Sequence, residues 1–138
     1  PIDKLINKYN KLVLDIFKLK IKDSIIKEAW FNYYDKNNFQ EVHTHKAPSI
    51  ILNNTIYKPS FSLIYILHDE NKNNNTIFKF PSNEFNYDFI INSDIINTGN
   101  IKNISEGTVI IFPFNFEHYV IPVSKNRITL AYNVYSSV

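Results

Sequence analysis

The chain contains four histidines, and three of them have the spacing of metal ligands: His43, His45 and His118. His43 and His45 are separated by one residue, so on a strand both imidazoles point to the same side. They can therefore face one cavity and meet His118, which follows much later in the chain. Imidazole nitrogen binds Fe(II), Zn and Cu, although a His-x-His pair also occurs by chance on exposed strands. The sequence predicts a metal site at these three side chains.

A charged side chain follows His118 in an apolar part of the sequence. Arg127 opens the segment Arg127 to Tyr135, whose β-branched and aromatic residues predict a strand. A permanently charged guanidinium in such surroundings needs a reason, because burying a lone charge is costly. Ser124 to Asn126 has the composition of a hairpin turn, which places the strand of His118 beside the strand of Arg127 in one sheet. We therefore expect both side chains to serve one site.

The elements that must position these residues are one helix and a series of short strands. Apolar residues recur at helical spacing from Ile2 to Phe17, which predicts an amphipathic helix over residues 2–18 that supports a sheet. Beyond Ser24 the pattern predicts eight or nine strands separated by turn residues. The predicted strands are 25–34, 39–45, 61–67, 76–80, 87–91, 101–104, 108–112, the strand of His118, and 127–135. No helical crossover pattern interrupts them, so we expect a mainly β, closed or double-sheet architecture.

Length and composition limit both the fold and the function. The chain has 138 residues, of which 44% are hydrophobic and 15% aromatic, so we expect one packed domain over 1–138 with its β core at about 25–136. Cys is absent, which excludes disulfides and thiolate ligands. The net charge of +2 is too small to indicate a nucleic-acid-binding surface. No segment approaches the roughly 20 apolar residues of a membrane span and no signal peptide is recognised, so we expect a cytoplasmic protein without a membrane partner.

Several motifs, taken in order, resemble those of a known family. They are Trp30-Phe-Asn32, Gln40-Glu-Val-His43-Thr-His45, the apolar strand Phe61 to Leu67, Gly107 to Pro113, His118, and Arg127-Ile-Thr129. Their order and spacing are similar to those of the 2-oxoglutarate- and Fe(II)-dependent oxygenases, in particular a small branch with a His-x-His pair and a late Arg. The resemblance covers residues 26–136. It implies a double-stranded β-helix, a jelly-roll and cupin-like fold, with the N-terminal helix as a supporting element.

The resemblance also implies an activity and a set of site residues. Enzymes of this family use Fe(II), 2-oxoglutarate and O2 to hydroxylate a substrate, and they release succinate and CO2. By position, the implied iron ligands are His43, His45 and His118, and no further catalytic residue is implied. The implied cosubstrate-binding residues are Arg127, Thr129, Asn32, Tyr34 and Tyr65. The substrate stays open, and we expect loops 46–60 and 82–86 to border the cavity mouth and determine specificity.

His45 departs from the family pattern, because the usual iron site combines two His with one carboxylate. Three interpretations follow from this difference. His45 is a ligand in a three-histidine site; or it supports a site to which water, Asp69 or Glu70 supplies the oxygen; or the activity has been lost. We favour the three-histidine site.

Two functions from other classes fit parts of the sequence. A cupin-like metal protein that is not an oxygenase also carries a His-x-His pair, and Gly107 to Pro113 followed by His118 is similar to a cupin motif. That interpretation gives Arg127 and Thr129 no task, and the Glu expected after the His pair is absent. A non-enzymatic binding module with a jelly-roll fold would instead have exposed aromatic residues and no metal.

Overall fold

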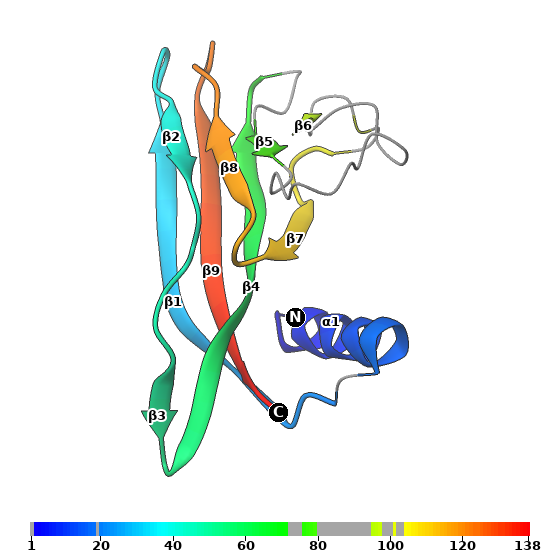
Figure 1. Cartoon of the computed structure of the whole chain (residues 1–138). Coiled ribbons are helices and arrows are strands. Elements are labelled where there is room, and N and C mark those ends of the chain that lie inside the picture. Colours follow the sequence, from blue (N-terminus) through cyan, green and yellow to red (C-terminus); the bar gives the residue numbers. More distant parts are fainter. Residues whose placement is uncertain (1, 19, 72–75, 80–94, 98–100, 102–103) are drawn as a thin grey trace.

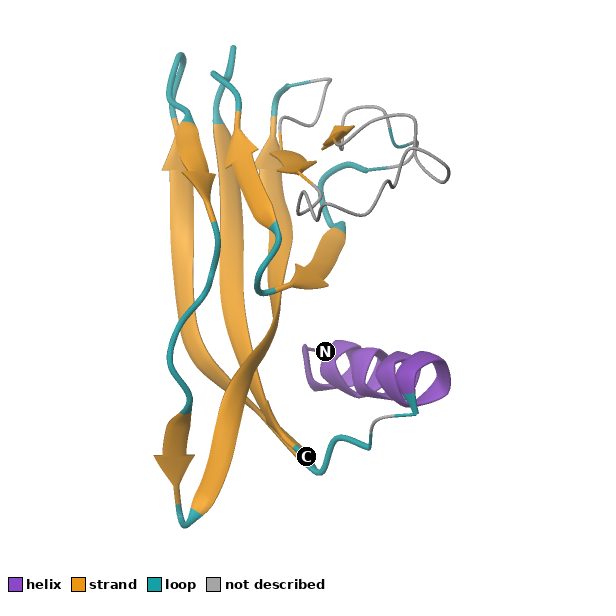
Figure 2. Ribbon diagram, in the orientation of Figure 1, coloured by secondary structure: helices purple, strands orange, loops and turns teal. Residues whose placement is uncertain are grey.

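The computed structural model describes residues 2–18, 20–71, 76–79, 95–97, 101 and 104–138. These residues contain one helix and nine strands (Figure 1). In chain order the elements are α1 (Ile2–Phe17), β1 (Asp23–Tyr34), β2 (Gln40–His43), β3 (Ile50–Leu52), β4 (Thr55–Asp69), β5 (Thr76–Lys79), β6 (Ile95–Asn97), β7 (Val109–Pro113), β8 (Glu117–Val120) and β9 (Arg127–Ser137). The expected mainly β chain with an N-terminal helix is confirmed (Figure 2).

The strands form two antiparallel sheets. The larger sheet has the order β1-β9-β4-β3, with β7 paired to β4, and the smaller sheet has the order β2-β8-β5-β6. β9 pairs along its length with both β1 and β4, so it is the central strand of the larger sheet. Successive residues of β9 point to opposite faces. Thr129 and Ala131 therefore line one face, whereas Leu130 and Tyr132 line the other.

The helix α1 covers the second of these faces. Ile6 is 6% exposed and packs against Phe61, Leu63 and Val134 of β4 and β9. The Tyr9 ring lies 3.9 Å from the Phe61 ring, centroid to centroid. The predicted supporting helix is thus confirmed, and its apolar stripe contributes to the core by removing hydrocarbon from water. In the described part of the chain, no helix is long and apolar enough to cross a lipid bilayer.

The first face of the larger sheet packs against the smaller sheet. One apolar cluster joins Ile64 of β4 and Phe112 of β7 to Phe78 of β5. A second cluster joins Tyr34 of β1 to Val120 at the end of β8, together with Val123 in the segment that follows. The core between the sheets therefore lies on the opposite side of β4 and β9 from the helix, and the histidines belong to this inner layer.

The structure corrects the expected hairpin between the strands of His118 and Arg127. β8 belongs to the smaller sheet and β9 to the larger one, so the two side chains lie on different sheets. The connecting residues 121–126 cross from one sheet to the other. Val123, only 1% exposed, is buried in this segment, and its N–H and carbonyl both hydrogen-bond to the turn between β1 and β2. A short polar turn has the same sequence pattern whether the chain folds back within one sheet or continues into another.

Two predicted strands differ in extent from the observed ones. The predicted strand 61–67 is part of β4, which begins at Thr55, and residues 46–58 contain the hairpin from β3 into β4. Asn53 and Asn54 form its turn with φ angles of 48° and 59°, as a two-residue turn of type I′ requires. β4 continues through Pro59 because the pairing with β9 shifts by one residue there, which accommodates a residue without an N–H. His68, which follows the predicted strand 61–67, lies near the end of β4.

The segment before β7 also differs from expectation. β6 at Ile95–Asn97 was not predicted, and Ile101 and Ile104 lie outside any strand. The predicted strand 87–91 and the predicted loop 82–86 lie outside the described residues. What the structure describes of this region is therefore β5, which pairs with β8 on one side and with β6 on the other.

Candidate metal centre

The structure brings the three predicted histidines together. His43 ends β2 and is the direct pairing partner of His118 on β8. His45 follows β2, and its backbone N–H donates to the Phe114 carbonyl at 2.9 Å, which holds this segment beside β8. Ring centroids are separated by 4.2 Å for His43 and His118, 4.9 Å for His45 and His118, and 5.3 Å for His43 and His45. One nitrogen from each ring lies within 4.8 Å of the other two.

Hydrogen bonds indicate which nitrogen of each ring faces the shared space. Nδ1 of His43 lies 2.8 Å from the Glu41 carbonyl, and Nδ1 of His118 lies 3.1 Å from the Phe116 carbonyl. A carbonyl can only accept a hydrogen bond, so in the neutral ring Nδ1 carries the proton and Nε2 carries the lone pair. Nδ1 of His45 contacts the Ser62 hydroxyl at 2.6 Å. All three rings thus present Nε2, with Nδ1 engaged as in natural metal sites.

Two of the imidazoles, those of His118 and His45, are held in the neutral form that metal binding requires. His118 is 2% exposed, and its pKa is lowered from 6.5 to about 4, chiefly by burial; the Phe116 carbonyl opposes the shift, and the nearby His43 and His45 contribute to it. Burial also lowers the pKa of His45, and the charge of a protonated His43 acts in the same direction. Protons therefore do not compete with a metal for these two rings near pH 7.

Aromatic side chains surround the histidines. The Phe112 ring centroid lies 4.7 Å from that of His118 and 5.8 Å from that of His45. Phe78 stacks on His118 at 5.6 Å, and Trp30 meets His45 edge-on at 5.6 Å. Phe112 and Phe78 are about 5% exposed or less. They give the imidazoles an apolar lining, which favours the neutral rings and excludes water.

The donor set fits a divalent transition metal. Three neutral imidazoles suit Fe(II), Zn, Cu or Ni. In the part of the chain that the structure describes, no carboxylate joins the three-histidine group. Asp69 instead contacts Arg127, and Glu70 lies near His68. The structure thus does not favour the interpretation in which Asp69 or Glu70 supplies an oxygen ligand.

Arg127 is a buried cation in the same cavity. Its side chain is 1% exposed, its Nη2 donates to the Thr76 hydroxyl at 2.7 Å, and its Nε lies 3.3 Å from the Asp69 carboxylate. The guanidinium also lies over the Tyr34 ring, 5.6 Å from its centroid. Burial lowers the pKa of Arg127, but Asp69 counteracts this effect and an arginine stays charged at any ordinary pH.

A polar row beside Arg127 contains the other predicted cosubstrate residues. Asn32 on β1 pairs with Thr129 on β9, and its amide donates to the Thr129 hydroxyl at 3.3 Å. The Trp30 indole N–H donates to the Asn32 carbonyl oxygen at 3.1 Å. The Tyr34 hydroxyl donates to the Gln40 side chain at 2.8 Å. These hydrogen bonds orient Asn32, Thr129 and Tyr34 within the layer that contains Arg127.

One narrow cavity joins the histidines to this polar row. Its volume is about 10 Å³, which is room for about one water molecule. Its lining residues come from both sheets: Trp30, Asn32, Tyr34, Gln40, His43, His45, Ile64, Thr76, His118, Val120, Arg127, Thr129 and Ala131. Sequence reasoning assigned no role to Trp30, Gln40 and Thr76. Trp30 and Gln40 stood within the quoted motifs, whereas Thr76 has no local signal because only the packing of the two sheets brings it to Arg127.

Tyr65, predicted as a cosubstrate-binding residue, does not join this group in the structure. It lines a different cavity of about 490 Å³, beside Leu130 and Tyr132 and under the start of α1. Neighbouring residues of a strand face opposite sides of the sheet. Because Ile64 faces the histidines, Tyr65 faces the helix.

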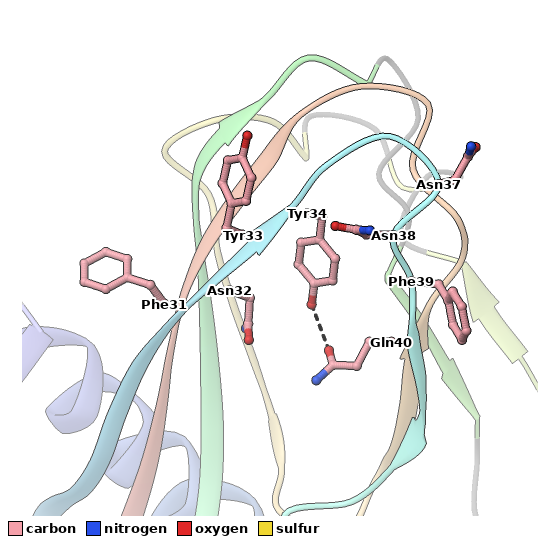
Figure 3. Close-up of a pocket in the computed structure, with 8 residues that line it drawn as sticks. All are labelled: Phe31, Asn32, Tyr33, Tyr34, Asn37, Asn38, Phe39 and Gln40. Carbon is pink, nitrogen blue, oxygen red and sulfur yellow. Dashed lines mark hydrogen bonds between the residues drawn. The ribbon is translucent and has the colours of Figure 1, made fainter.

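A wider cavity of about 500 Å³ adjoins the narrow one at the turn between β1 and β2. Asn32, Tyr34 and Gln40 line both, and Figure 3 shows the Tyr34 hydroxyl directed at Gln40 between them. The remaining lining residues are Phe31, Tyr33, Asn37, Asn38 and Phe39. Among the residues that the structure describes, no charged side chain lines the wider cavity, and the rings of Phe31, Tyr33 and Phe39 are each at least 60% exposed.

The chain is similar in structure to known oxygenases. It superimposes on a prolyl-4-hydroxylase from Pseudomonas putida with a TM-score of 0.52 at 12% identity, covering 96% of this chain and 61% of that one. It superimposes on an oxidoreductase of the 2OG-Fe(II) oxygenase family from Burkholderia pseudomallei with a TM-score of 0.58 at 16% identity, covering 91% of this chain and 50% of that one. At these identities the likeness concerns the fold alone.

The chain thus spans only half to about three fifths of the length of these two enzymes. No protein-family model matches the sequence, and no curated protein matches it either. The structural neighbours and the three-histidine group together define a fold shared with 2OG-Fe(II) oxygenases and a possible metal site.

Proposed function

We propose that the protein is an Fe(II)- and 2-oxoglutarate-dependent oxygenase whose residues 1–138 form one double-stranded β-helix domain. The observation that carries the proposal is one cavity that holds three imidazoles, all with Nδ1 hydrogen-bonded, and a buried arginine. The likeness to two oxygenases of this kind supports it at the level of the fold. Its substrate would be oxidised by O2 with succinate and CO2 as co-products.

His43, His45 and His118 would hold Fe(II) through Nε2. Bound Fe(II) would supply the chemistry in which O2 and the keto acid convert a substrate C–H bond to an alcohol. The chain's own contribution is to keep His45 and His118 neutral and to keep water away. Burial performs both tasks, because the rings of Phe112 and Phe78 cover His118.

Arg127 and Thr129 would bind the distal carboxylate of 2-oxoglutarate. A guanidinium can donate two parallel hydrogen bonds to a carboxylate, and a hydroxyl can donate one more. Asp69 and Thr76 orient the guanidinium through Nε and Nη2, and Asn32 orients the Thr129 hydroxyl. The aromatic face of Tyr34 restricts the guanidinium on one side.

Cosubstrate binding requires lining side chains to move. The narrow cavity holds about one water molecule, and 2-oxoglutarate is larger. Tyr34 and Gln40 line both this cavity and the wider one and are joined by a hydrogen bond of 2.8 Å. Breaking that bond costs little, because a typical neutral hydrogen bond contributes about 1 kcal/mol net. We therefore assign the entry route to the turn between β1 and β2.

One observation favours a second candidate, a cupin-like metal protein that is not an oxygenase. Within the described residues the metal-binding group contains no carboxylate, whereas the usual oxygenase site contains one. This alternative leaves Arg127 and Thr129 without a ligand to bind, so the two candidates differ in their response to 2-oxoglutarate.

Anaerobic titration tests the proposal. We expect Fe(II) to bind and 2-oxoglutarate then to produce the weak visible charge-transfer band of a chelated keto acid. Arg127→Lys keeps the charge but loses the planar fork, and Thr129→Val removes the hydroxyl, so both should weaken keto-acid binding. Thr55→Val, at the hairpin end of β4, is the matched control and should bind as the wild type. Iron binding without a band would favour the cupin-like protein.

A further inference from the structure

A chain of hydrogen bonds runs from His45 across the larger sheet to a carboxylate. His45 Nδ1 lies 2.6 Å from Ser62 Oγ, Ser62 Oγ donates to Asn133 Oδ1 at 2.7 Å, and Asn133 Nδ2 donates to Glu28 Oε2 at 2.8 Å. We propose that Ser62, Asn133 and Glu28 are positioning residues that hold His45 as a metal ligand and couple it to a carboxylate. As far as it concerns the metal, this inference rests on the proposed function.

The donor and the acceptor of each hydrogen bond in this chain follow from its last residue, Glu28. An ionised Glu28 can only accept, so Asn133 must present its NH2 group there and its carbonyl oxygen to Ser62. The Ser62 proton is then given to Asn133, which leaves the Ser62 oxygen to accept from His45. His45 Nδ1 must therefore carry the proton, and Nε2 must carry the lone pair that a metal needs. Ser62 is fully buried, so water does not offer it another partner.

Two irregularities of the sheet bring these residues into line. β1 pairs with β9 in one register up to Ile26 and shifts by one residue at Lys27, so that Glu28 lies opposite Asn133. With the first register maintained, Lys27 would take that place, and an ammonium cannot accept a hydrogen bond. Bulges of this kind redirect side chains and are typical of functional sites.

β4 contains a second shift, at Ser60. Pro59 pairs with Tyr135, and Phe61 already pairs with Val134, so Ser62 lies opposite Asn133. With the first register maintained, Phe61 would lie opposite Asn133, and the chain of hydrogen bonds would end at Asn133. Both shifts are therefore needed to set Glu28, Asn133 and Ser62 side by side on three strands.

The hydrogen-bond chain from His45 through Ser62 and Asn133 to Glu28, which we call the relay, connects the three-imidazole site to a negative charge that its ligands lack. A carboxylate ligand would neutralise one of the two charges of a divalent metal, and three neutral imidazoles neutralise none. A hydrogen-bonded acceptor on Nδ1 makes Nε2 a stronger donor, and such outer partners commonly change metal affinity by about 10- to 100-fold. His43 and His118 use backbone carbonyls for this purpose, so His45 alone is connected to a side-chain carboxylate.

The metal-free protein provides the first test, which is independent of iron and 2-oxoglutarate. Long-range ¹H–¹⁵N NMR correlations of the imidazoles should show His45 with its proton on Nδ1. In Ser62→Ala we expect this tautomer to be lost for His45 but kept for His43 and His118. Ser136→Ala removes another buried serine of the same sheet, bonded to Ser24 at 2.9 Å, and should change nothing. An unchanged His45 tautomer in Ser62→Ala would overturn the relay.

Titration with Co(II) tests the coupling to the carboxylate. We expect Ser62→Ala to weaken Co(II) binding about tenfold or more. Glu28→Gln keeps a hydrogen-bond acceptor but removes the negative charge. It should therefore also weaken Co(II) binding, but by less than Ser62→Ala does. Glu28 is exposed, so this variant folds even where Ser62→Ala does not. Asp23→Asn is its control, since Asp23 lies on the same strand and accepts from the Tyr57 hydroxyl.

Unchanged Co(II) affinity in Glu28→Gln would refute the role of the carboxylate. Failure of the oxygenase proposal has a different signature. In that case the keto-acid band is missing, while the His45 tautomer and the Co(II) affinities still follow the relay.

Discussion

At the scale of single residues, His118 shows how burial prepares a ligand. The ring is 2% exposed and lies among Phe112, Phe78 and two other imidazoles. Desolvation penalises its charged form, so the pKa falls to about 4. The same burial that serves metal binding makes the folded state sensitive to acid.

We predict a pH dependence of stability in the metal-free protein. The pKa of His118 is about 4 when folded and about 6.5 when unfolded, so between these values the unfolded state binds more protons. The stabilisation is fully present above about pH 6.5 and is lost as the pH falls to about 4. A shift of this size corresponds to about 3 kcal/mol. Urea unfolding measured across this range, with a chelator present, will check the decline.

His118→Asn should reduce the slope of the free energy of unfolding against pH. A smaller slope should remain because the pKa of His45 is lowered in the same direction. His68→Asn provides a comparison because His68 is 42% exposed in its side chain. Equal slopes in wild type and His118→Asn would contradict the assignment.

At the scale of elements, shifts of register decide which side chains meet. β4 and β9 change register between Ile66 and His68, which sets Asp69 opposite Arg127. Without this shift His68 would face Arg127, and a buried cation would have an imidazole in place of a carboxylate. Glu28 and Ser62 reach Asn133 through two further shifts, so three irregularities serve the polar residues of one sheet.

Asp69→Asn should therefore be strongly destabilising. It removes the charge that balances Arg127 at a place where the two side chains are 6% and 1% exposed. Breaking a buried ion pair from one side leaves an uncompensated charge, and we expect a loss of about 3 kcal/mol in the free energy of unfolding. Glu117→Gln breaks the exposed pair with Lys79 and should cost less than about 1 kcal/mol. Similar losses in the free energy of unfolding for Asp69→Asn and Glu117→Gln, measured by urea unfolding, would contradict this account.

At the scale of the whole molecule, the candidate site depends on both sheets. The histidines lie on and beside β2 and β8 of the smaller sheet, whereas Ser62 and Arg127 belong to the larger one. The cavity shared by the histidines and Arg127 exists only when the two sheets are packed face to face, and α1 packs on the other side of the larger sheet. A metal at this site would bind the folded chain and not the unfolded one.

Metal binding should therefore raise global stability. Co(II) at about 100 times its dissociation constant should increase the free energy of unfolding by about 2.7 kcal/mol. His43→Ala removes one of the three rings and should lose most of this gain, whereas His68→Ala, outside the group, should retain it. Thermal or urea unfolding with and without Co(II) measures the difference. An equal gain in both variants would place the metal elsewhere.

Features of the protein that depend on local spacing follow from the sequence alone. The periodicity of apolar residues from Ile2 to Phe17 is sufficient for an amphipathic helix, because one face must be buried whatever lies opposite. Alternating and β-branched segments are sufficient for the mainly β class. The His43 and His45 pair on one side of a strand, with His118 as its distant partner, also follows from strand geometry.

Long-range packing, in contrast, determines which strands share a sheet and which residues face each other across it. The separation of His118 from Arg127, and the orientation of Tyr65 toward α1, depend on how strands pair over long distances. The meeting of Asp69 with Arg127, and of Glu28 and Ser62 with Asn133, depends on one-residue shifts in pairing. Such shifts change every later contact along a strand but leave no periodic signal, because their stabilisation comes from partners far away in the chain.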